Sequence, residues 1–355
     1  MTDDTTTPIS ASVIGATGYL GGEVIRLLAN HPHVEIASLT SQSQAGRPIH
    51  SFHPTLRGVV NKEFEDYTAE RIAEVSDVVF CAVPHGAAFT VVKELFDIRP
   101  DLTIIDLSAD FRLRDVDTYQ SWYNTEHTAS SLIKEAIYGL CEHYREDIAQ
   151  ARLIANPGCY PTSALLALIP LVKRGLISTD GIVVDSKSAL SGAGRKLSHQ
   201  SHYAHCNESI MAYAVGAHRH TPEIEQEVGL RAHGDVALNF TPHLTPMNRG
   251  ILSTIYASAA DGTSTAALRQ AYDEDYGDEY FVRFLEEGAW PETRSVRATN
   301  FCDLQCTLDP RTGRVIIVSA IDNLVKGGAG QAIQNLNIIK GFDERAGLDA
   351  SGVYI

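Results

Sequence analysis

The sequence of 355 residues contains no apolar run that approaches the roughly 20 residues needed to span a bilayer. Its first ten residues, MTDDTTTPIS, also lack the basic and apolar regions of a secretory signal. It shows no internal repeat, long linker or low-complexity segment. We therefore expect a cytoplasmic protein with no membrane partner.

Positive charge is scarce, because 29 Lys and Arg residues face 44 Asp and Glu residues, for a formal net charge of −15. Proteins that bind the phosphate backbone of nucleic acids need a basic surface, so nucleic acid is not expected as a partner. An acidic chain would also repel an acidic protein. The sequence favours a small-molecule substrate, with any anionic group held by a few local arginines or amides.

Cysteine is thinly spread, and its spacing does not suggest a disulfide framework. The six cysteines stand at positions 81, 141, 159, 206, 302 and 306. Several fall in apolar, strand-like runs, so we interpret them as reduced thiols. Cys302 and Cys306 have no second ligand pair nearby, and we expect no metal.

What the sequence does contain is the composition of a compact globular protein, with 44% hydrophobic and 21% charged residues. Its length indicates about two domains. In the first part, strand-like runs alternate with helical patterns, which favours parallel strands joined by right-handed crossovers. The predicted strands are 12–14, 34–39, 78–83 and 103–107, and the predicted helices are 22–30 and 87–96.

The pattern changes near Pro157, after which strand-like runs follow one another with few helices. This is typical of an α+β domain with a mixed or antiparallel sheet. The predicted strands are 181–185, 236–240, 250–257, 302–308 and 315–321, and the predicted helices are 265–276 and 330–339. We predict an α/β protein with a nucleotide-binding domain at 1–157 and a second domain at 158–327. A C-terminal segment at about 328–355 should pack back on the first domain.

Gly15, Gly18 and Gly21 form a GxxGxxG turn between the first strand and the first helix. Glycine there permits a tight turn, lets a pyrophosphate approach the backbone amides, and lets the helix pack closely on its strand. The context predicts a Rossmann-type dinucleotide-binding domain. The alternative is a glycine turn with no ligand in another α/β protein.

The end of the second predicted strand indicates which dinucleotide binds. An NAD site typically places a carboxylate there, on the ribose 2′-hydroxyl. Here the chain reads SLTSQS at 38–43, with Arg47 nearby, and Glu35 lies too early in the strand. Hydroxyls and a guanidinium suit a 2′-phosphate, so we predict NADP(H).

Cys159 is the leading candidate nucleophile. It lies in the run NPGCYPT at 156–162, where an apolar strand stops and a helical pattern starts. Backbone N–H groups at a helix start favour negative charge and can lower a thiol pKa below its free value of about 8.5. The alternative is a small buried cysteine under a turn.

A second chemical cluster is HRHTPEIE at 218–225, which contains His218, His220 and Glu223. An imidazole can shuttle protons near neutral pH, and one beside a thiol can help to ionise it. The alternative is a solvated helix N-terminus, with Thr221 as its cap and Glu223 in its first turn.

Three other polar segments carry weaker signals. The run SGAGRK at 191–196 resembles a backbone anion nest, and Arg112 follows the fourth strand at the edge where α/β ligands bind. Flexible exposed loops are the alternative, which we prefer for Lys196. A polar loop is favoured over a metal cluster for His199, His202, His205 and Cys206.

Taken together, seven segments closely resemble the N-acetyl-γ-glutamyl-phosphate reductase family. They cover nearly the whole chain, and the pair NPGCYPT and HRHTPEIEQ is the specific part. The segments are GATGYLGGE at 15–23, SADFRL at 108–113, YGL at 138–140, NPGCYPT at 156–162, SGAGR at 191–195, HRHTPEIEQ at 218–226 and IDNLVKGGAGQAIQN at 321–335. One departure is Cys141, where relatives typically have proline.

The resemblance implies a semialdehyde dehydrogenase-like fold and a homodimer or homotetramer built through the second domain. It implies NADPH-dependent reduction of N-acetyl-glutamyl 5-phosphate to the 5-semialdehyde in arginine biosynthesis. It assigns Cys159 and His218 to catalysis, with His218 as acid/base, but the sequence does not rank His218 against His220. The implied substrate contacts are Arg112, Ser191, Gly192, Tyr213, His220 and Glu223. The implied cofactor contacts are Gly15, Thr17, Gly18, Tyr19, Leu20, Gly21, Thr40, Ser41, Ser43, Asn323 and Gly327.

The residue chemistry fits this reaction, because a Cys159 thiolate can attack an acyl phosphate, release phosphate and leave a thioester that accepts hydride. Two rivals remain within the same chemistry, a reductase of aspartyl phosphate and one of carrier-linked aminoadipyl phosphate. The carrier would need a basic docking face, which this acidic chain does not suggest. A third alternative is a non-catalytic NADP-binding regulator, which would have no need for Cys159 with His218.

Overall fold

The computed structural model describes residues 7–352, which divide into two compact units. Of the described residues, the first unit combines 7–157 with Gly328–Ala350, and the second unit combines Gly158–Gly327 with Ser351 and Gly352. The first six residues, read above for a secretory signal, and residues 353–355 of the predicted C-terminal segment lie outside the described part. Within it, no helix is both long and apolar enough to cross a membrane.

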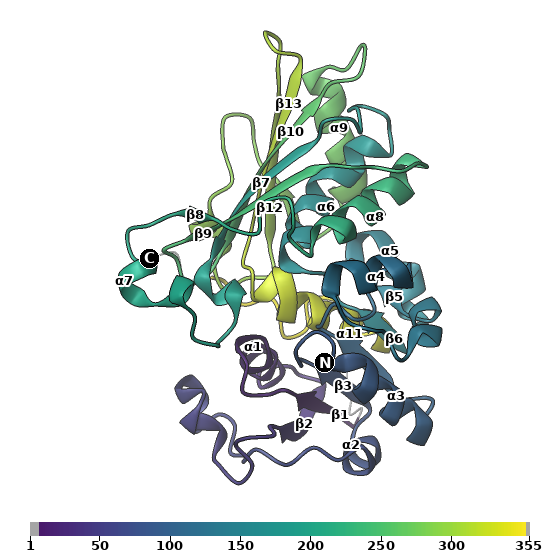
Figure 1. Cartoon of the computed structure of the whole chain (residues 1–355), viewed down its shortest axis with the longest axis vertical. Helices are drawn as coiled ribbons and strands as arrows, with labels where there is room; N and C mark the ends of the chain where they lie inside the picture. Colours follow the sequence, from purple (N-terminus) through teal and green to yellow (C-terminus); the bar gives the residue numbers. More distant parts are fainter. Residues whose placement is uncertain (1–6, 353–355) are drawn as a thin grey trace, which may run out of the picture. The chain divides into compact units, whose positions relative to one another are not determined.

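The first unit is built on a six-stranded sheet in which all neighbouring strands are parallel, in the order β2-β1-β3-β4-β6-β5. Figure 1 shows β1, β2 and β3 of this sheet. The strands are β1 Ile9–Ile14, β2 Val34–Thr40, β3 Val78–Cys81, β4 Thr103–Asp106, β5 Ile137–Tyr138 and β6 Leu153–Ala155. The helices are α1 Tyr19–Leu28, α2 Ala69–Val75, α3 Ala88–Ile98, α4 Val116–Tyr123, α5 Cys141–Ala149 and α11 Gly330–Lys340. Parallel neighbours need crossover helices, and every residue of β3 and β4 is buried as that arrangement requires.

The helix α11 joins this unit through amide side chains. The amides of Gln331 and Asn335 both donate to the carbonyl of Gly139, at 2.7 and 2.9 Å. Asn337 Oδ1 lies 2.8 Å from Nε2 of the buried His31.

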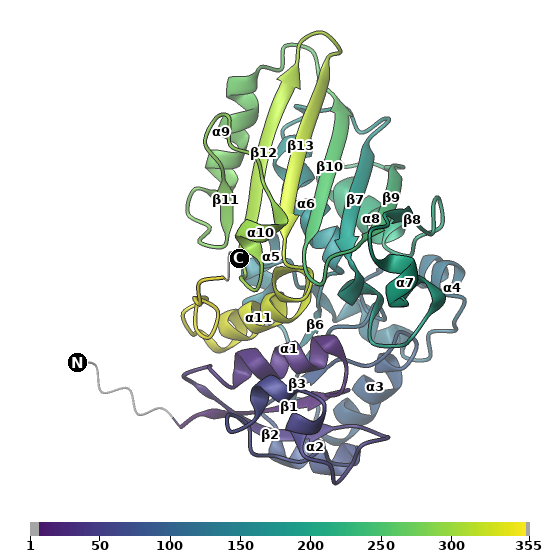
Figure 2. The same ribbon diagram turned by 90° about the vertical axis from the view of Figure 1, so that its left-hand side faces the viewer.

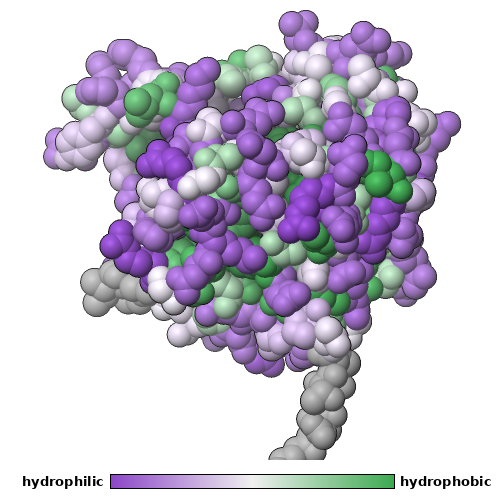
Figure 3. Space-filling view, turned by 90° about the horizontal axis from the view of Figure 1, so that it is seen from below, coloured by the Kyte–Doolittle hydropathy of each residue, from purple (hydrophilic) through white to green (hydrophobic). Residues whose placement is uncertain are grey.

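The surface seen in Figure 3 is largely hydrophilic, with hydrophobic residues in small separate patches, as expected for a surface in contact with water.

Buried carboxylates gather at the end of β4. Asp110 accepts hydrogen bonds from the backbone of Gly86, Ala88 and Phe89, and thereby caps the start of α3. Asp106 accepts from both the backbone and the hydroxyl of Ser108. Because Asp106 is fully buried and lies near the charge of Asp110, its pKa is raised to about 7.

The second unit contains a seven-stranded mixed sheet in the order β11-β12-β13-β10-β7-β9-β8. Its strands are β7 Val183–Ala189, β8 Met211–Ala212, β9 Asn239–Thr245, β10 Ile251–Ser258, β11 Val282–Phe284, β12 Cys302–Asp309 and β13 Arg314–Ile321. Its helices are α6 Cys159–Val172, α7 Tyr203–Cys206, α8 Thr221–Ala232, α9 Thr265–Tyr276 and α10 Thr293–Val296. The pairs β7·β9 and β11·β12 are parallel, and the others are antiparallel. The predicted fold class, a Rossmann-type domain with an α+β domain around a mixed sheet, is confirmed.

The strand predicted at 236–240 is misplaced, because β9 begins at Asn239 and continues to Thr245 through Pro242. A proline argues against a strand when only the sequence is read. In the structure, the carbonyl of Pro242 still accepts a hydrogen bond from the backbone of Tyr213. Pro242 therefore does not end the strand, and β9 stays paired in parallel with β7 on both sides of it.

The two faces of this sheet differ. The helices α6 and α9 pack on one face. Figure 2 shows the opposite face of β12, β13, β10 and β7, which no long helix of residues 7–352 covers. Along β10, Ile251, Ser253 and Ile255 are completely buried. The alternate positions are more open, and Tyr256 is 38% exposed. The alternation with period two is that of a strand with one covered face.

A chain of buried hydroxyls fixes α6 on the sheet. Ser163 Oγ lies 2.8 Å from Ser253 Oγ of β10 and 3.0 Å from Ser319 Oγ of β13. Ser253 lies 2.7 Å from Ser186 of β7, and Ser319 lies 3.6 Å from the sulfur of Cys302 on β12. All five side chains are inaccessible to water. Since the rest of α6 is almost entirely apolar, this serine chain sets where the helix lies along the sheet.

Ser253→Ala should lower the free energy of unfolding by about 1–3 kcal/mol, because the buried hydroxyl of Ser186 loses its neighbour. Ser258→Ala, at a half-exposed position of the same strand, is the control and should cost less than about 0.5 kcal/mol. Urea unfolding followed by circular dichroism measures both. Equal, small effects of the two substitutions would contradict the role given to the serine chain.

Asp106 should make the first unit less stable as pH rises. Its pKa is raised from 3.8 to about 7 on folding, so the folded state holds a proton that the unfolded state has released between these values. Stability is therefore lost progressively from about pH 4 to pH 7. Asp106→Asn removes this titration. Between pH 4.5 and pH 8, the free energy of unfolding of the wild type should therefore fall by about 2 kcal/mol or more relative to that of the variant. Urea titrations at both pH values measure it, and a pH-independent difference would disprove the assignment.

Candidate active site

Cys159 is the first residue of α6, and Gly158 before it has an extended backbone. The five other cysteines are buried, whereas Cys159 is partly exposed. Burial raises the pKa of Cys306 to about 12 and that of Cys81 well above its usual value. The first turn of a helix has no intrahelical acceptors for its N–H groups, and these groups favour an anion. Cys159 is thus the thiol of the described chain that is both accessible and at a helix start.

Two residues hold the surroundings of Cys159. The Glu223 carboxylate, 1% exposed, accepts a hydrogen bond of 2.8 Å from the backbone N–H of Gly158. A Cβ on Gly327 would lie 2.8 Å from Cβ of Cys159, so only glycine fits there. Gly327, predicted as a cofactor contact, is therefore packed directly on the candidate nucleophile.

His218 belongs to a cluster of rings beside this helix start. Its Nε2 lies 3.4 Å from Oη of Tyr213, which lies 3.1 Å from Oη of the buried Tyr160. The rings of Phe240 and His220 lie 5.2 and 4.9 Å from the His218 ring. The charge of Cys159 contributes to the raised pKa values of both Tyr160 and Tyr213, which places the thiol within electrostatic reach of the cluster.

Burial, aided by the positive charge of Arg219, lowers the pKa of His218 to about 4. Burial also raises the pKa of Tyr213 to about 12. At neutral pH, therefore, His218 is an uncharged imidazole and Tyr213 an uncharged phenol. The interpretation of 218–225 as a solvated helix N-terminus is wrong, because α8 begins with Thr221, Pro222 and Glu223 all buried and His220, not Thr221, in the capping position.

Ser191 and Gly192 meet Asn323 in a second group of the same unit. Asn323 Nδ2 donates to Ser191 Oγ at 2.9 Å, and its Oδ1 accepts from the backbone of Gly250 at 2.8 Å. A Cβ on Gly192 would lie 3.2 Å from Oγ of Ser188. The structure thus brings Asn323, predicted as a cofactor contact, together with two predicted substrate contacts. Lys196 lies on an exposed stretch.

The glycine turn lies in the first unit. Gly15 has a φ of 82°, and a Cβ there would lie 2.3 Å from the carbonyl oxygen of Ala82. A Cβ on Gly21 would lie 2.5 Å from the carbonyl oxygen of Gly15. Gly18, which follows Thr17, is the N-cap of α1. The helix begins with Tyr19 and Leu20 and has no acidic residue in its first turn. A turn of this shape, with N–H groups at the start of a ten-residue helix, fits the pyrophosphate of a dinucleotide.

The end of β2 presents buried and exposed hydroxyls. Thr40 and Ser41 are buried, whereas Ser43 is exposed and accepts from the Gln44 amide. Arg47 lies on the same exposed loop. Sequence patterns did not indicate Glu65, which forms an isolated parallel β-bridge with Thr40 at the end of β2, 25 positions earlier in the chain. Its carboxylate accepts from the hydroxyl of Ser38 and lies 3.8 Å from Arg71.

Arg112 is 5% exposed and donates to two backbone carbonyls, those of Asn156 at 2.8 Å and Leu107 at 3.0 Å. It therefore ties the end of β4 to the segment that follows β6. Cys141, the departure from the family pattern, is buried at the start of α5, with its sulfur 3.4 Å from Oδ1 of Asn335.

Three histidines of the loop after β7 lie together, since the His205 ring is 3.9 Å from that of His199 and 5.5 Å from that of His202. Across residues 7–352, no three side chains of the metal-binding types are arranged to hold an ion.

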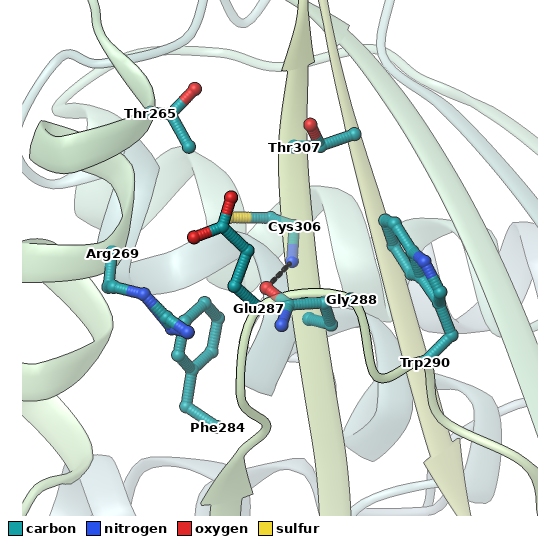
Figure 4. A pocket seen from close by; sticks show the side chains of 9 residues that line it. Thr265, Arg269, Phe284, Glu287, Gly288, Trp290, Cys306 and Thr307 are labelled. Carbon is teal, nitrogen blue, oxygen red and sulfur yellow. Dashed lines mark hydrogen bonds between the residues drawn. The ribbon is translucent and has the colours of Figure 1, made fainter.

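A separate cavity of about 260 Å³ opens beside β12 (Figure 4). There Arg269 lies over the ring of Phe284, and the Gln305 amide oxygen accepts a hydrogen bond from the backbone of Cys306. None of the predicted catalytic or binding residues lines it.

Comparison with known proteins agrees with this arrangement. The model of the semialdehyde dehydrogenase NAD-binding domain matches residues 10–151, and that of the semialdehyde dehydrogenase dimerisation domain matches 159–323. The structure is similar to aspartate semialdehyde dehydrogenase II from Vibrio cholerae, with a TM-score of 0.69, 14% identity and coverage of 95% of this chain and 99% of that one. It is also similar to the Candida albicans aspartate semialdehyde dehydrogenase solved with NADP, with a TM-score of 0.67, 18% identity and coverage of 94% and 99%. At these identities the likeness concerns the fold.

Curated relatives are much closer in sequence. The N-acetyl-gamma-glutamyl-phosphate reductase of Desulforamulus reducens is 49% identical over 346 residues, 98% of this chain and 99% of its own length. That of Pelotomaculum thermopropionicum is 51% identical with the same coverage. The resemblance found in the sequence motifs is confirmed. The chain belongs to the N-acetyl-gamma-glutamyl-phosphate reductase family and carries both domains of the semialdehyde dehydrogenases.

Proposed function

We propose that the chain catalyses the NADPH-dependent reduction of N-acetyl-L-glutamyl 5-phosphate to N-acetyl-L-glutamate 5-semialdehyde and phosphate, a step of arginine biosynthesis. The observation that carries the proposal is the position of Cys159, a partly exposed thiol at a helix start. Its charge affects the pKa values of Tyr160 and Tyr213, and Tyr213 contacts His218. Relatives that match 98% of the chain bear the name of this activity.

The reaction uses Cys159 as a covalent catalyst. Its thiolate attacks the carbonyl carbon of the acyl phosphate, the carbon–oxygen bond to phosphate breaks, and a thioester remains on the sulfur. Bound NADPH supplies the hydride that reduces this thioester. The tetrahedral centre then carries a negative oxygen, and cleavage of the carbon–sulfur bond releases the aldehyde and restores the thiolate. Hydrogen-bond donors around Cys159 stabilise each oxyanion, and one such donor is worth about 3–4 kcal/mol.

The remaining residues take supporting parts. His218 and Tyr213 face the reacting carbonyl, and the ring of His220 lies beside that of His218. Glu223 holds the backbone at Gly158, and Gly327 leaves room for the acylated thiol. Ser191, Gly192 and Asn323 form a polar group suited to the substrate's acetamido or carboxylate end. Arg112 holds the backbone of Asn156, three positions before the nucleophile.

For the cofactor, the α1 start with Gly15, Gly18 and Gly21 would hold the pyrophosphate. Ser43 and Arg47, on the exposed loop after β2, would meet the 2′-phosphate. The Glu65 carboxylate, which lies beside the end of β2, accepts a hydrogen bond from Ser38.

We also propose a homodimer formed through the uncovered face of β10 and β13, with a homotetramer as the larger form. The dimerisation-domain model spans this sheet, and Leu252, Tyr256, Ile316 and Val318 are left partly exposed on it. The cytoplasmic location expected from the sequence stays a prediction.

Cys159→Ser should lower kcat by at least about 1,000-fold, because a serine hydroxyl at neutral pH is a far weaker nucleophile than a thiolate. NADPH binding, followed by fluorescence, should be retained. Cys206→Ser, a buried cysteine at the end of α7, is the matched control and should keep full activity. The assay is phosphate-dependent oxidation of N-acetyl-glutamate semialdehyde, with aspartate semialdehyde as the competing substrate. A preference for aspartate semialdehyde would assign the chain to the rival acyl-phosphate reductase, and substantial activity of Cys159→Ser would eliminate the covalent route.

NADPH should be used with a higher kcat/KM than NADH, because Arg47 and nearby hydroxyls suit a 2′-phosphate. Arg47→Ala should raise KM for NADPH by roughly tenfold and leave KM for NADH nearly unchanged, since a charge-assisted contact contributes about 1.5–3 kcal/mol. Steady-state kinetics with both cofactors decides the matter. A wild-type preference for NADH would refute our interpretation of Thr40, Ser41 and Ser43.

A further inference from the structure

The protonation site of His218 follows from its backbone neighbour. The N–H of His220 points at Nδ1 of His218, with 3.1 Å between the nitrogens. A backbone N–H can only donate, so Nδ1 must accept and carries no proton. A neutral imidazole has one N–H, which therefore stands on Nε2.

The direction of the next hydrogen bonds then follows. Nε2–H of His218 donates to Oη of Tyr213 at 3.4 Å, which leaves the Tyr213 hydroxyl to donate to Tyr160 at 3.1 Å. Tyr160 in turn donates to the backbone carbonyl of His243 at 3.4 Å. A fixed donor starts this chain and a fixed acceptor ends it, so its three side chains share one orientation.

The surroundings of His218 disfavour its charged form. Its hydrogen bonds and ring contacts in the described part of the chain are with His220, Tyr213, Tyr160 and Phe240, and none is a carboxylate. The guanidinium of Arg219 repels an imidazolium, and burial adds to the cost. Glu223, the nearest acidic residue in sequence, points its carboxylate at the backbone of Gly158.

We propose that His218 acts as a neutral imidazole whose Nε2–H donates to the substrate oxyanion, that it is not the base for Cys159, and that Tyr160 is a positioning residue that orients it through Tyr213. This inference rests on the function proposed above and gives His218 a different part from the acid/base role implied by the family resemblance. When substrate binds, the Nε2 hydrogen is shared between the oxyanion and Oη of Tyr213 as a three-centre hydrogen bond, so the contact that orients the ring is kept.

The proton and electron balance agrees with this part. The Cys159 proton passes to solvent before the attack, since the sulfur is partly exposed. In the acylation, phosphate leaves with the electron pair of its carbon–oxygen bond and takes a proton from solvent. In the reduction, hydride adds to the thioester carbon and the carbonyl electron pair moves to oxygen. That pair returns when the carbon–sulfur bond breaks, and the sulfur leaves with its own electrons as a thiolate. No step deposits a proton on His218, so a neutral donor suffices throughout.

Alkylation of Cys159 by iodoacetamide, measured against pH, separates the two roles. If His218 were the base or ion-pair partner of the thiol, His218→Gln would move the midpoint of the alkylation profile upward by about one pH unit or more. We expect the midpoint to stay unchanged while kcat falls about 100-fold or more, the usual loss for one oxyanion donor. An upward shift would overturn the proposal.

Ring ¹⁵N NMR of the full-length chain labelled on histidine tests the proton position directly. The His218 signals are identified by their loss in His218→Gln. We expect a neutral Nε2–H ring that does not titrate between pH 5.5 and 8. A proton on Nδ1, or an imidazolium at pH 7, would exclude the proposal whatever the kinetics show.

The part of Tyr160 is tested with Tyr160→Phe, which keeps the buried ring and removes the hydroxyl. We expect kcat to fall about tenfold with KM nearly unchanged. We also expect the His218 ring signals to broaden or to report a mixture of the two neutral tautomers. Tyr272→Phe is the matched control, because it removes another buried tyrosine hydroxyl that bonds to the α6 carbonyl of Ala167. Equal kinetic effects of the two variants would reduce Tyr160 to a structural residue and refute its positioning role. Failure of the wild type to act on either semialdehyde would defeat the proposed function instead, while the NMR and alkylation results would still decide the state of His218.

Discussion

The position of the first turn of α6 is the constraint on which the rest of the site depends. It is fixed from two sides, by the Glu223 carboxylate on the N–H of Gly158 and by the serine chain that begins one helical turn later at Ser163. Between these anchors the helix cannot slide or rotate without separating buried polar groups. Cys159 therefore stays at a defined height on the sheet, and Gly327 packs against it because nothing larger fits.

This arrangement contains an electrostatic conflict. A carboxylate at the start of α6 satisfies a backbone donor, yet it also adds negative charge near the place where a thiolate must form. The neighbouring residues do not compensate with a charged histidine, since burial and Arg219 keep His218 neutral. The anion is left to backbone N–H groups and to uncharged donors, which suits a site that must stabilise a thiolate and two successive oxyanions in turn.

Much of the fold was predictable because local patterns determine it. The glycine turn after β1, the helix at 265–276 and the thiol at the start of α6 all depend on residues close together in the sequence. The structure confirms the bounds 265–276, whereas α1 is Tyr19–Leu28 and not the predicted 22–30, because the glycine turn already passes into the helix at Gly18. What the sequence could not predict depends on contacts between distant segments. Examples are Ser163 with Ser319, 156 positions apart, and Glu223 with Gly158, 65 positions apart.

The candidate site shows the same division. The family resemblance indicated His218 and Tyr213 but gave no part to Tyr160, although it lies in NPGCYPT, because that part comes from a hydroxyl that meets Tyr213 across 53 positions. The strand β9 was misplaced because Pro242 is an unfavourable strand residue when no neighbouring strand is known. The resemblance implied Asn323 and Gly327 as cofactor contacts, which stays a prediction, but it did not indicate that they pack on Ser191 and Cys159.

The uneven exposure of the six cysteines has a consequence for the chain in the presence of oxidants. Peroxide that reaches the protein meets Cys159 first, since the other five sulfurs are shielded by the interior. Oxidation would first give a sulfenic acid at this one position, which thiol reductants reverse, and catalysis would be lost while the buried cysteines of the fold stayed reduced.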